Sequence, residues 1–132
     1  MLEVPQGLTE EQFAALSAKV RSAAEQYGTD IRVQGSRVKG TARPDSDLDI
    51  AILVSAEQFE EFLRQRFGVP NPGSAKERTM QHARAMGKIQ AGEAGLRPLR
   101  TALEAEFGME VDISIICVGG RFDSPPYVAL RQ

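Results

Sequence analysis

The 132-residue sequence lacks the features that mark several large classes of protein. It contains one cysteine, which excludes an internal disulfide. Its apolar runs are far shorter than the roughly 20 residues that span a bilayer, so we expect no membrane partner. No basic segment followed by an apolar one opens the sequence, and we expect no signal for its own export. The formal net charge is −2, so any contact with nucleic acid would need a local basic patch.

The lone cysteine and the lone histidine are both poor candidates for catalysis. Cys117 lies at the end of an apolar run, which favours a buried and inert thiol over a nucleophile. His82 lies on a polar helix, which favours a surface position over the role of a general base. We therefore look for the chemistry of this chain in other side chains.

Apolar spacing and capping residues predict helices that alternate with strands. Thr9, Ser55 and Ser74 each have a Gln or Glu three positions later, which predicts a capping box at the start of a helix. The expected strands are Ile31–Gln34, the run from Asp47 to Val54, and Val111–Val118. The helices are expected to begin after the three caps, at Ser36 (a short one) and at Leu96. The length suits one domain over residues 1–132, with a loose leader (1–8), an inserted loop and helix (69–95) and an irregular tail (119–132).

The stretch from Gly35 to Val54 carries the most specific signal. Asp47 and Asp49 open an apolar run, and residues two apart on a strand share a face, so their carboxylates project together. A divalent cation would relieve their repulsion, and hard oxygen ligands suit Mg²⁺ or Mn²⁺. Upstream, Gly35 permits a sharp turn and the close approach of a phosphate, while Ser36 and the following N–H groups can bind an anion. This layout suits a nucleoside triphosphate.

The same residues resemble a known motif. Gly35-Ser36, ten intervening residues and Asp47-x-Asp49 resemble the active-site motif of the DNA polymerase beta-like nucleotidyltransferase superfamily, in its minimal form. The resemblance implies a nucleotidyltransferase fold of the α/β (α+β) class, in which a small mixed sheet of about three to four strands packs against helices. It also implies a third acidic residue on a neighbouring strand. Asp112 matches by context, and Glu110 and Glu106 are alternatives that we expect to face water.

The resemblance further implies an activity and a mechanism. Two Mg²⁺ or Mn²⁺ ions would bind at Asp47 and Asp49, one bridging the triphosphate oxygens and the other, also held by Asp112, lowering the pKa of an acceptor hydroxyl. That hydroxyl would attack the α-phosphate, so that NMP passes from NTP to the acceptor and pyrophosphate leaves. Asp47, Asp49 and Asp112 are therefore the expected catalytic and metal-binding residues.

Basic residues lie between the glycine turn and the carboxylates. Lys39 and Arg43 either contact phosphates or form part of a solvated turn, and both interpretations stay open. For Arg37 a solvated turn is the better interpretation. The expected nucleotide-binding residues are Gly35, Ser36, Lys39, Arg43 and Ser46. The basic helix 76–88 is expected to be a solvated face, with an RNA acceptor as the alternative.

Two small groups of the superfamily suit a chain of this length. The segments 68–99 and 119–123 resemble the nucleotidyltransferase toxin domain at the C-terminus of bacterial polymorphic and contact-dependent inhibition exoproteins. That resemblance implies secretion within a larger exoprotein, action in the cytoplasm of a target bacterium, an RNA (such as tRNA) or protein acceptor, and a cognate immunity protein. The alternatives are a minimal antitoxin that modifies a partner ribonuclease toxin, and a module that binds nucleotide without turnover.

Overall fold

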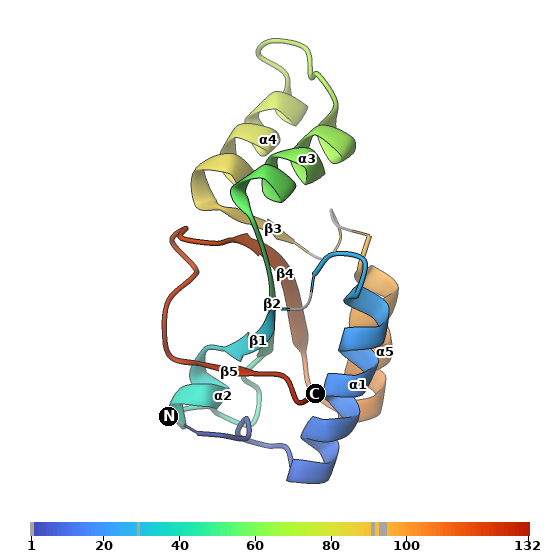
Figure 1. Ribbon diagram of the computed structural model, residues 1–132, viewed down its shortest axis with the longest axis vertical. Helices are drawn as coiled ribbons and strands as arrows, with labels where there is room; N and C mark the ends of the chain where they lie inside the picture. The colour runs from blue at the N-terminus through green and yellow to red at the C-terminus, as the bar shows by residue number, and fades with distance from the viewer. Residues whose placement is uncertain (1, 29, 91, 93–94) are drawn as a thin grey trace.

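A mixed sheet forms the centre of the molecule (Figure 1). The computed structural model describes residues 2–28, 30–90, 92 and 95–132, and these residues form five strands in the order β3-β4-β2-β1-β5. The central pair, β2 and β4, is parallel, whereas every other neighbouring pair is antiparallel. The strands are β1 (Ile31–Gln34), β2 (Leu48–Val54), β3 (Lys88–Gln90), β4 (Val111–Cys117) and β5 (Tyr127–Ala129).

Helices cover one face of the sheet and extend beyond one end of it. They are α1 (Glu10–Ala24), α2 (Ser36–Lys39), α3 (Ala56–Phe67), α4 (Ala75–Met86) and α5 (Arg97–Phe107). Helices α1 and α5 lie side by side against the sheet, and α3 and α4 form a hairpin that stands away from it (Figure 1). Among the described residues, no helix has the length and apolar character needed to cross a membrane.

The alternation of side chains along β2 and β4 divides the sheet into two different faces. On β2, Leu48, Ile50, Ile52 and Val54 enter the core under α1 and α5, together with alternate residues of β4. Complete burial of one such side chain contributes about 1.5–3 kcal/mol. The opposite face of β2 carries Asp49, because neighbouring residues on a strand point to opposite sides. The same alternation that buries apolar side chains in the core therefore places the acidic side chains on the opposite face of the sheet.

The segment 118–126 covers part of that second face. Phe122 packs against a small apolar cluster of Ala51, Leu53 and Ile116 on β2 and β4. The segment crosses the side of the sheet opposite to α1 and α5 (Figure 1). Between this segment and the carboxylates the sheet face remains open, which leaves room for a ligand.

Buried polar contacts hold the same segment in place. The guanidinium of Arg32, on β1, donates to Asp123 at 2.9 Å and to Asp30 at 3.3 Å. The side-chain amide of Gln34 donates to the carbonyl of Phe122 at 3.0 Å. These bonds fix the position of Phe122 relative to β1 and β2.

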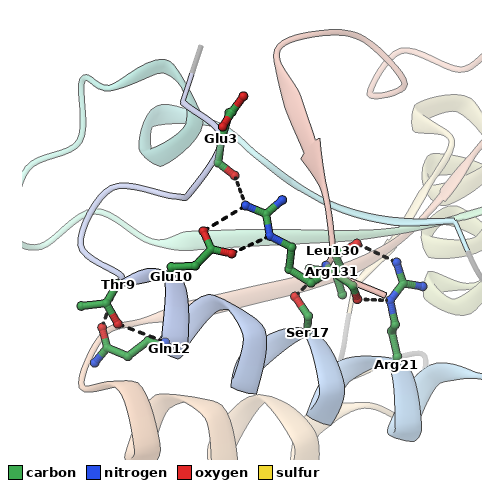
Figure 2. Close-up of polar contacts among 8 residues, drawn as sticks. All are labelled: Glu3, Thr9, Glu10, Gln12, Ser17, Arg21, Leu130 and Arg131. Atoms are coloured by element: carbon green, nitrogen blue, oxygen red, sulfur yellow. Dashed lines mark hydrogen bonds and ion pairs between the residues drawn. The ribbon is translucent and has the colours of Figure 1, made fainter.

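The last residues of the chain are fastened to α1 (Figure 2). The guanidinium of Arg21 donates to the carbonyls of Leu130 and Arg131, at 2.8 and 2.7 Å. The backbone N–H of Arg131 donates to Ser17 Oγ at 3.0 Å, and its guanidinium pairs with Glu10 at 2.9 Å. These contacts keep β5 beside β1, so the segment 118–126 is anchored at both ends.

The predicted fold class is confirmed, and the sheet has two strands more than the three that apolar runs predicted. Strand β3 lies within the expected insertion, and β5 lies in the tail that was expected to be irregular. Each has three residues, which is too short for a recognisable period. Hydrogen bonding to the longer strands β4 and β1 stabilises them instead.

Three local expectations need correction. The leader, expected to be loose, donates two backbone hydrogen bonds to α2: Leu2 N to Val38 O, and Gln6 N to Arg37 O. The capping box expected at Ser74 is only half formed, because the Glu77 carboxylate accepts from Gly73 N–H instead of that of Ser74.

The third correction concerns the thiol. Cys117 is half-buried and not fully buried, because β4 ends there and the chain turns out of the sheet.

Candidate active site

The acidic residues meet at the start of the two parallel strands. In the β2–β4 register Asp49 lies directly opposite Asp112, and Asp47 immediately precedes β2. Adjacent strands are about 4.8 Å apart, so side chains at opposed positions on one face are close neighbours. Both Asp49 and Asp112 are half-buried. The parallel pairing thus brings together carboxylates that are far apart in the sequence.

The surroundings make Asp49 hard to ionise. Burial is the main cause, followed by repulsion from Asp112 and then from Asp47, and together these raise the pKa of Asp49 to about 6. Lys88 and Arg37 act in the opposite direction. Negative charge is therefore concentrated here beyond what the nearby cations neutralise.

Asp112 has two polar neighbours on the same sheet face. The Ser114 hydroxyl donates to Asp112 Oδ2 at 3.4 Å, and Lys88 Nζ lies 3.7 Å from the same oxygen. The ammonium of Lys88 also lies 4.7 Å from the ring centroid of Phe122. Lys88, on β3, thus connects the carboxylates with the segment that covers the sheet.

Gly35 is required by the position of Asp49. Its φ is +85°, a left-handed value that residues with a Cβ rarely adopt. A Cβ at Gly35 would also overlap Asp49 Oδ2 and come within 3.3 Å of the carboxyl carbon. The turn between β1 and α2 therefore passes directly against the carboxylate.

These groups open into one cavity of about 310 Å³. Its floor is the sheet face with Asp49, Asp112 and Ser114, and segment 118–126 forms the opposite wall. The lining residues are Gln34, Gly35, Lys39, Asp49, Ile50, Ala51, Lys88, Asp112, Ser114, Ile116, Arg121, Phe122, Ser124, Pro125 and Pro126. A cavity of this size, with a glycine turn and paired carboxylates, suits a small polar ligand that carries phosphates and cations.

Comparison with known proteins identifies the family. The family model described as "Nucleotidyltransferase domain" matches residues 16–117, which is most of the chain and includes the glycine turn and all three aspartates. The chain belongs to the nucleotidyltransferase domain family. No curated protein and no solved structure matches the chain significantly. The family makes transfer of a nucleotide the general activity of this domain.

The nucleotidyltransferase domain brings only some of the predicted residues into the cavity. Asp49, Asp112, Gly35 and Lys39 line it. Asp47 lies outside the lining, although its charge acts on Asp49. Lys39 is exposed, which leaves its ammonium available to a bound anion.

Other predicted nucleotide-binding residues are not part of the lining. Ser36 is half-buried at the start of α2. The Ser46 hydroxyl accepts a hydrogen bond from the backbone N–H of Arg43 at 2.8 Å, which closes the turn before β2. The Arg43 side chain is exposed. The structure thus gives Ser46 a local role in the turn.

Arg37 is not the solvated residue that the sequence indicated. It is 4% exposed, and its guanidinium donates to the carbonyls of Gln6 at 2.7 Å and Ser46 at 2.7 Å. It therefore joins the leader to the turn that precedes Asp47. Charged residues in a basic run are usually solvated, and only the three-dimensional path of the leader reveals this partner.

The alternatives to Asp112 lie outside the cavity. Glu110 and Glu106 are exposed, as expected. A hydrogen bond with Asp47, and repulsion from its charge, raise the pKa of Glu110, whereas Glu106 pairs with Lys19 on α1. His82 is exposed on α4 and lies outside the lining of this cavity.

The donor chemistry of the nucleotidyltransferase site fits a divalent cation. Among the described residues, no group of three or more His, Cys, Asp or Glu side chains is gathered closely enough to enclose one. Asp49 and Asp112 nevertheless present hard oxygen ligands side by side, and the repulsion that raises the pKa of Asp49 is of the kind that Mg²⁺ or Mn²⁺ relieves. Together with Asp47, they are the residues that would hold it.

Sequence reasoning missed the far wall of the cavity. Lys88, Arg121 and Phe122 line it from β3 and from segment 118–126. Ser114 could have been found, because it follows Asp112 at the alternation of a strand. Lys88 reaches the cavity because β3 pairs with β4, and Arg121 and Phe122 reach it because segment 118–126 folds back over the sheet. No local pattern in the sequence encodes either arrangement.

Proposed function

We propose that this chain is a metal-dependent nucleotidyltransferase that moves NMP from NTP to a hydroxyl acceptor. The observation that carries the proposal is the opposition of Asp49 and Asp112 across β2 and β4, with Gly35 against Asp49 and one cavity in front of all three. Acidic pairs of this kind are costly to maintain without a cation. The glycine turn beside them suits a phosphate, which supports a cation that arrives with a triphosphate.

Each residue then has a defined part. Gly35 and Ser36 bind phosphate oxygens through backbone N–H groups and a hydroxyl, and Lys39 adds a positive charge. Asp47, Asp49 and Asp112 would hold divalent cations, which would supply neutralisation of phosphate charge and a lower pKa for the acceptor hydroxyl. The acceptor oxygen bonds to the α-phosphorus, the bond to the β-phosphate oxygen breaks, and pyrophosphate leaves with the electron pair. The chain contributes chiefly by positioning these groups.

The biological role we propose is that of an antibacterial toxin domain. The support is the resemblance of segments 68–99 and 119–123 to toxin domains of polymorphic and contact-dependent exoproteins. The domain would then be delivered into the cytoplasm of a target bacterium, would modify RNA such as tRNA or a protein, and would be neutralised by an immunity protein. Segment 119–123 forms part of the cavity wall, so this resemblance concerns the site itself.

Incubation with labelled nucleoside triphosphates and a bacterial extract tests the proposal. We expect the wild type to label a macromolecule and release pyrophosphate when Mg²⁺ or Mn²⁺ is present. The Asp47→Ala/Asp49→Ala variant should do neither. Labelling of a ribonuclease toxin alone would indicate the antitoxin role. Binding of nucleotide without pyrophosphate release in any extract would indicate a binding module and contradict the proposed activity.

A further inference from the structure

The leader packs against the segment 41–47, which leads from α2 to β2 and ends at Asp47. It runs beside α2 (Figure 1), and the backbone N–H of Gln6 donates to the carbonyl of Arg37 at 2.8 Å. The side chain of Gln6 makes two hydrogen bonds with Ala42, since its oxygen accepts from the backbone N–H at 2.9 Å and its nitrogen donates to the carbonyl at 3.3 Å. Gln6 therefore holds both α2 and the start of segment 41–47.

The guanidinium of Arg37 extends this contact to Asp47. Its Nε and Nη2 donate to the carbonyl of Ser46, at 3.1 and 2.7 Å, and its Nη1 donates to the carbonyl of Gln6 at 2.7 Å. The Ser46 carbonyl belongs to the planar peptide unit that also contains the nitrogen of Asp47. Because Arg37 is 4% exposed, close packing limits the movement of its guanidinium. The orientation of the peptide bond that leads into Asp47 is thus coupled to the leader.

Gly7 permits the leader to approach Arg37 this closely. Its φ is +95°, a value that residues with a Cβ rarely adopt. A Cβ built at Gly7 would lie 2.5 Å from Arg37 Nη1, which is closer than such atoms approach one another. Any other residue at this position would therefore press on the guanidinium that holds the carbonyls of Gln6 and Ser46.

The leader lies outside the region that the family model describes. The match covers residues 16–117, which includes Arg37 and Asp47, whereas Gln6 and Gly7 precede it. Membership of the family therefore gives the leader no role. Its contacts with Arg37 and Ala42 are features of this chain that need an explanation of their own.

We propose that Gln6, Gly7 and Arg37 are positioning residues that hold Asp47 in place to bind a divalent cation. This inference rests on the proposed function, in which Asp47 is a metal ligand. Replacing a residue that supports a metal ligand commonly weakens metal affinity by about 10- to 100-fold. The leader therefore contributes to the metal affinity of the site, although none of its described residues lines the cavity.

The test measures the binding of Mn²⁺ and not activity. Mn²⁺ alone is titrated into folded protein, and free Mn²⁺ is followed by electron paramagnetic resonance. We expect Gly7→Ala to raise the Kd for Mn²⁺ about tenfold. Gln6→Ala should raise it less, because it removes both bonds to Ala42 and keeps the backbone bonds of the leader. Hydrogen exchange in residues 43–47 should become faster in both variants.

Substitution of Arg37 separates positioning from charge. Arg37→Lys keeps the positive charge, but an ammonium cannot reproduce the forked geometry that reaches Gln6 and Ser46 together. We expect it to weaken Mn²⁺ binding about as much as Gly7→Ala does. Adding Gly7→Ala to Arg37→Lys should change the Kd little further, because both substitutions disrupt one contact. Wild-type affinity in Arg37→Lys would mean that only the charge matters and would overturn the inference.

Two variants control for a general loss of stability. Arg21→Met removes a guanidinium that also donates to two carbonyls, those of Leu130 and Arg131 at the end of the chain. Gly108→Ala places a Cβ on a φ of +69°, with no atom within 4 Å of it. Both variants should lower the Tm and leave the Kd for Mn²⁺ unchanged. Weaker Mn²⁺ binding in these controls, equal to that in Gly7→Ala, would reduce the effect to stability and contradict a positioning role.

The outcomes also separate this inference from the proposed function. If Asp47→Ala weakens Mn²⁺ binding while Gly7→Ala and Gln6→Ala bind as the wild type does, the leader has no positioning role and the proposed function stands. If the wild type binds neither Mn²⁺ nor a nonhydrolysable triphosphate, the proposed function is contradicted and the inference falls with it.

Discussion

At the scale of single residues, Gly35 is the position where the smallest change has the largest expected effect. Gly35→Ala places a methyl group where Asp49 Oδ2 now lies and imposes a Cβ on a φ of +85°. We expect triphosphate binding to be lost in titration calorimetry, because the turn or the carboxylate must move. Gly35→Val should have at least as large an effect, since its branched side chain is stiffer.

The control for Gly35 is another glycine in a similar backbone conformation. Gly68 has a φ of +61°, and no atom lies within 4 Å of a Cβ built there. Gly68→Ala should lower stability by about 1 kcal/mol and leave nucleotide binding intact. Equal nucleotide affinities in Gly35→Ala and the wild type would show that the glycine turn does not form part of the site.

Asp112 separates binding from chemistry. Asp112→Asn keeps the shape of the side chain and removes a negative charge opposite Asp49. We expect near-normal affinity for Mg²⁺-nucleotide and transfer reduced by orders of magnitude, because the lost interaction belongs to the transition state. Nucleotide titration and pyrophosphate release measure the two effects. Transfer at the wild-type rate would exclude Asp112 as the third carboxylate and make Glu110 the next residue to substitute.

The raised pKa of Asp49 predicts a pH dependence of stability in metal-free buffer. The pKa is about 6 in the folded chain and 3.8 in the reference state, so the folded chain binds the proton more tightly. The contribution of this group to stability is therefore complete below pH 3.8 and is lost as the pH rises through about 6. Thermal melting with a chelator, at pH 4.5 and 7, should show a fall in Tm for the wild type that is smaller in Asp49→Asn. An equal fall in both would mean that Asp49 titrates normally.

The sequence identifies the near side of the site because that chemistry is local. Gly35, Asp47 and Asp49 lie close together in the sequence, and Asp112 opens the only other long apolar run that fits the pattern. Lys88 and Phe122 could not be predicted, since both reach the site from segments whose position depends on the completed sheet.

At the scale of elements, the contact of Arg32 with the segment 118–126 is the clearest target. Arg32 is 6% exposed, pairs with Asp123 at 2.9 Å and lies 3.7 Å above the ring of Tyr127. Arg32→Met leaves a largely buried carboxylate without its cation, which should cost about 2 kcal/mol or more. We expect a lower denaturant midpoint, together with faster hydrogen exchange in residues 119–126.

A surface ion pair is the control for Arg32. Lys19 and Glu106 pair between α1 and α5, with side chains 42% and 44% exposed. Lys19→Met should change stability by less than about 1 kcal/mol, because exposed pairs contribute little. A similar loss in both variants, or unchanged exchange in residues 119–126 of Arg32→Met, would mean that the buried pair does not hold the segment.

The helices and strands differ in how well the sequence predicts them. Helices α1, α3 and α4 begin next to the predicted caps, because a cap is a contact between residues three positions apart. The sequence does not predict strands β3 and β5, because their hydrogen bonds to β4 and β1 stabilise them and their own residues show no strand pattern.

At the scale of the whole molecule, the toxin role predicts a phenotype. Expression of the chain in bacterial cytoplasm should stop growth. The Asp47→Ala/Asp49→Ala variant should restore growth, because we expect it to fold but to lack the two carboxylates proposed to bind the cation. Growth curves and the amount of soluble protein measure this. Normal growth with abundant, folded wild-type protein would contradict the toxin role and leave the nucleotidyltransferase fold unaffected.

The exposed turn between α3 and α4 divides the site between two stretches of chain. Val69, in that turn, is 96% exposed. The turn lies at the far end of the α3–α4 hairpin, away from the sheet (Figure 1). A cut there leaves Gly35 and Asp49 on one fragment and Lys88 and Asp112 on the other. Strands β2 and β4, which pair in the intact sheet, then belong to different fragments. Neither fragment carries all of the residues that we propose to bind metal and nucleotide. We therefore expect a domain divided at this turn to transfer nucleotide only when fused partner proteins bring its two halves together.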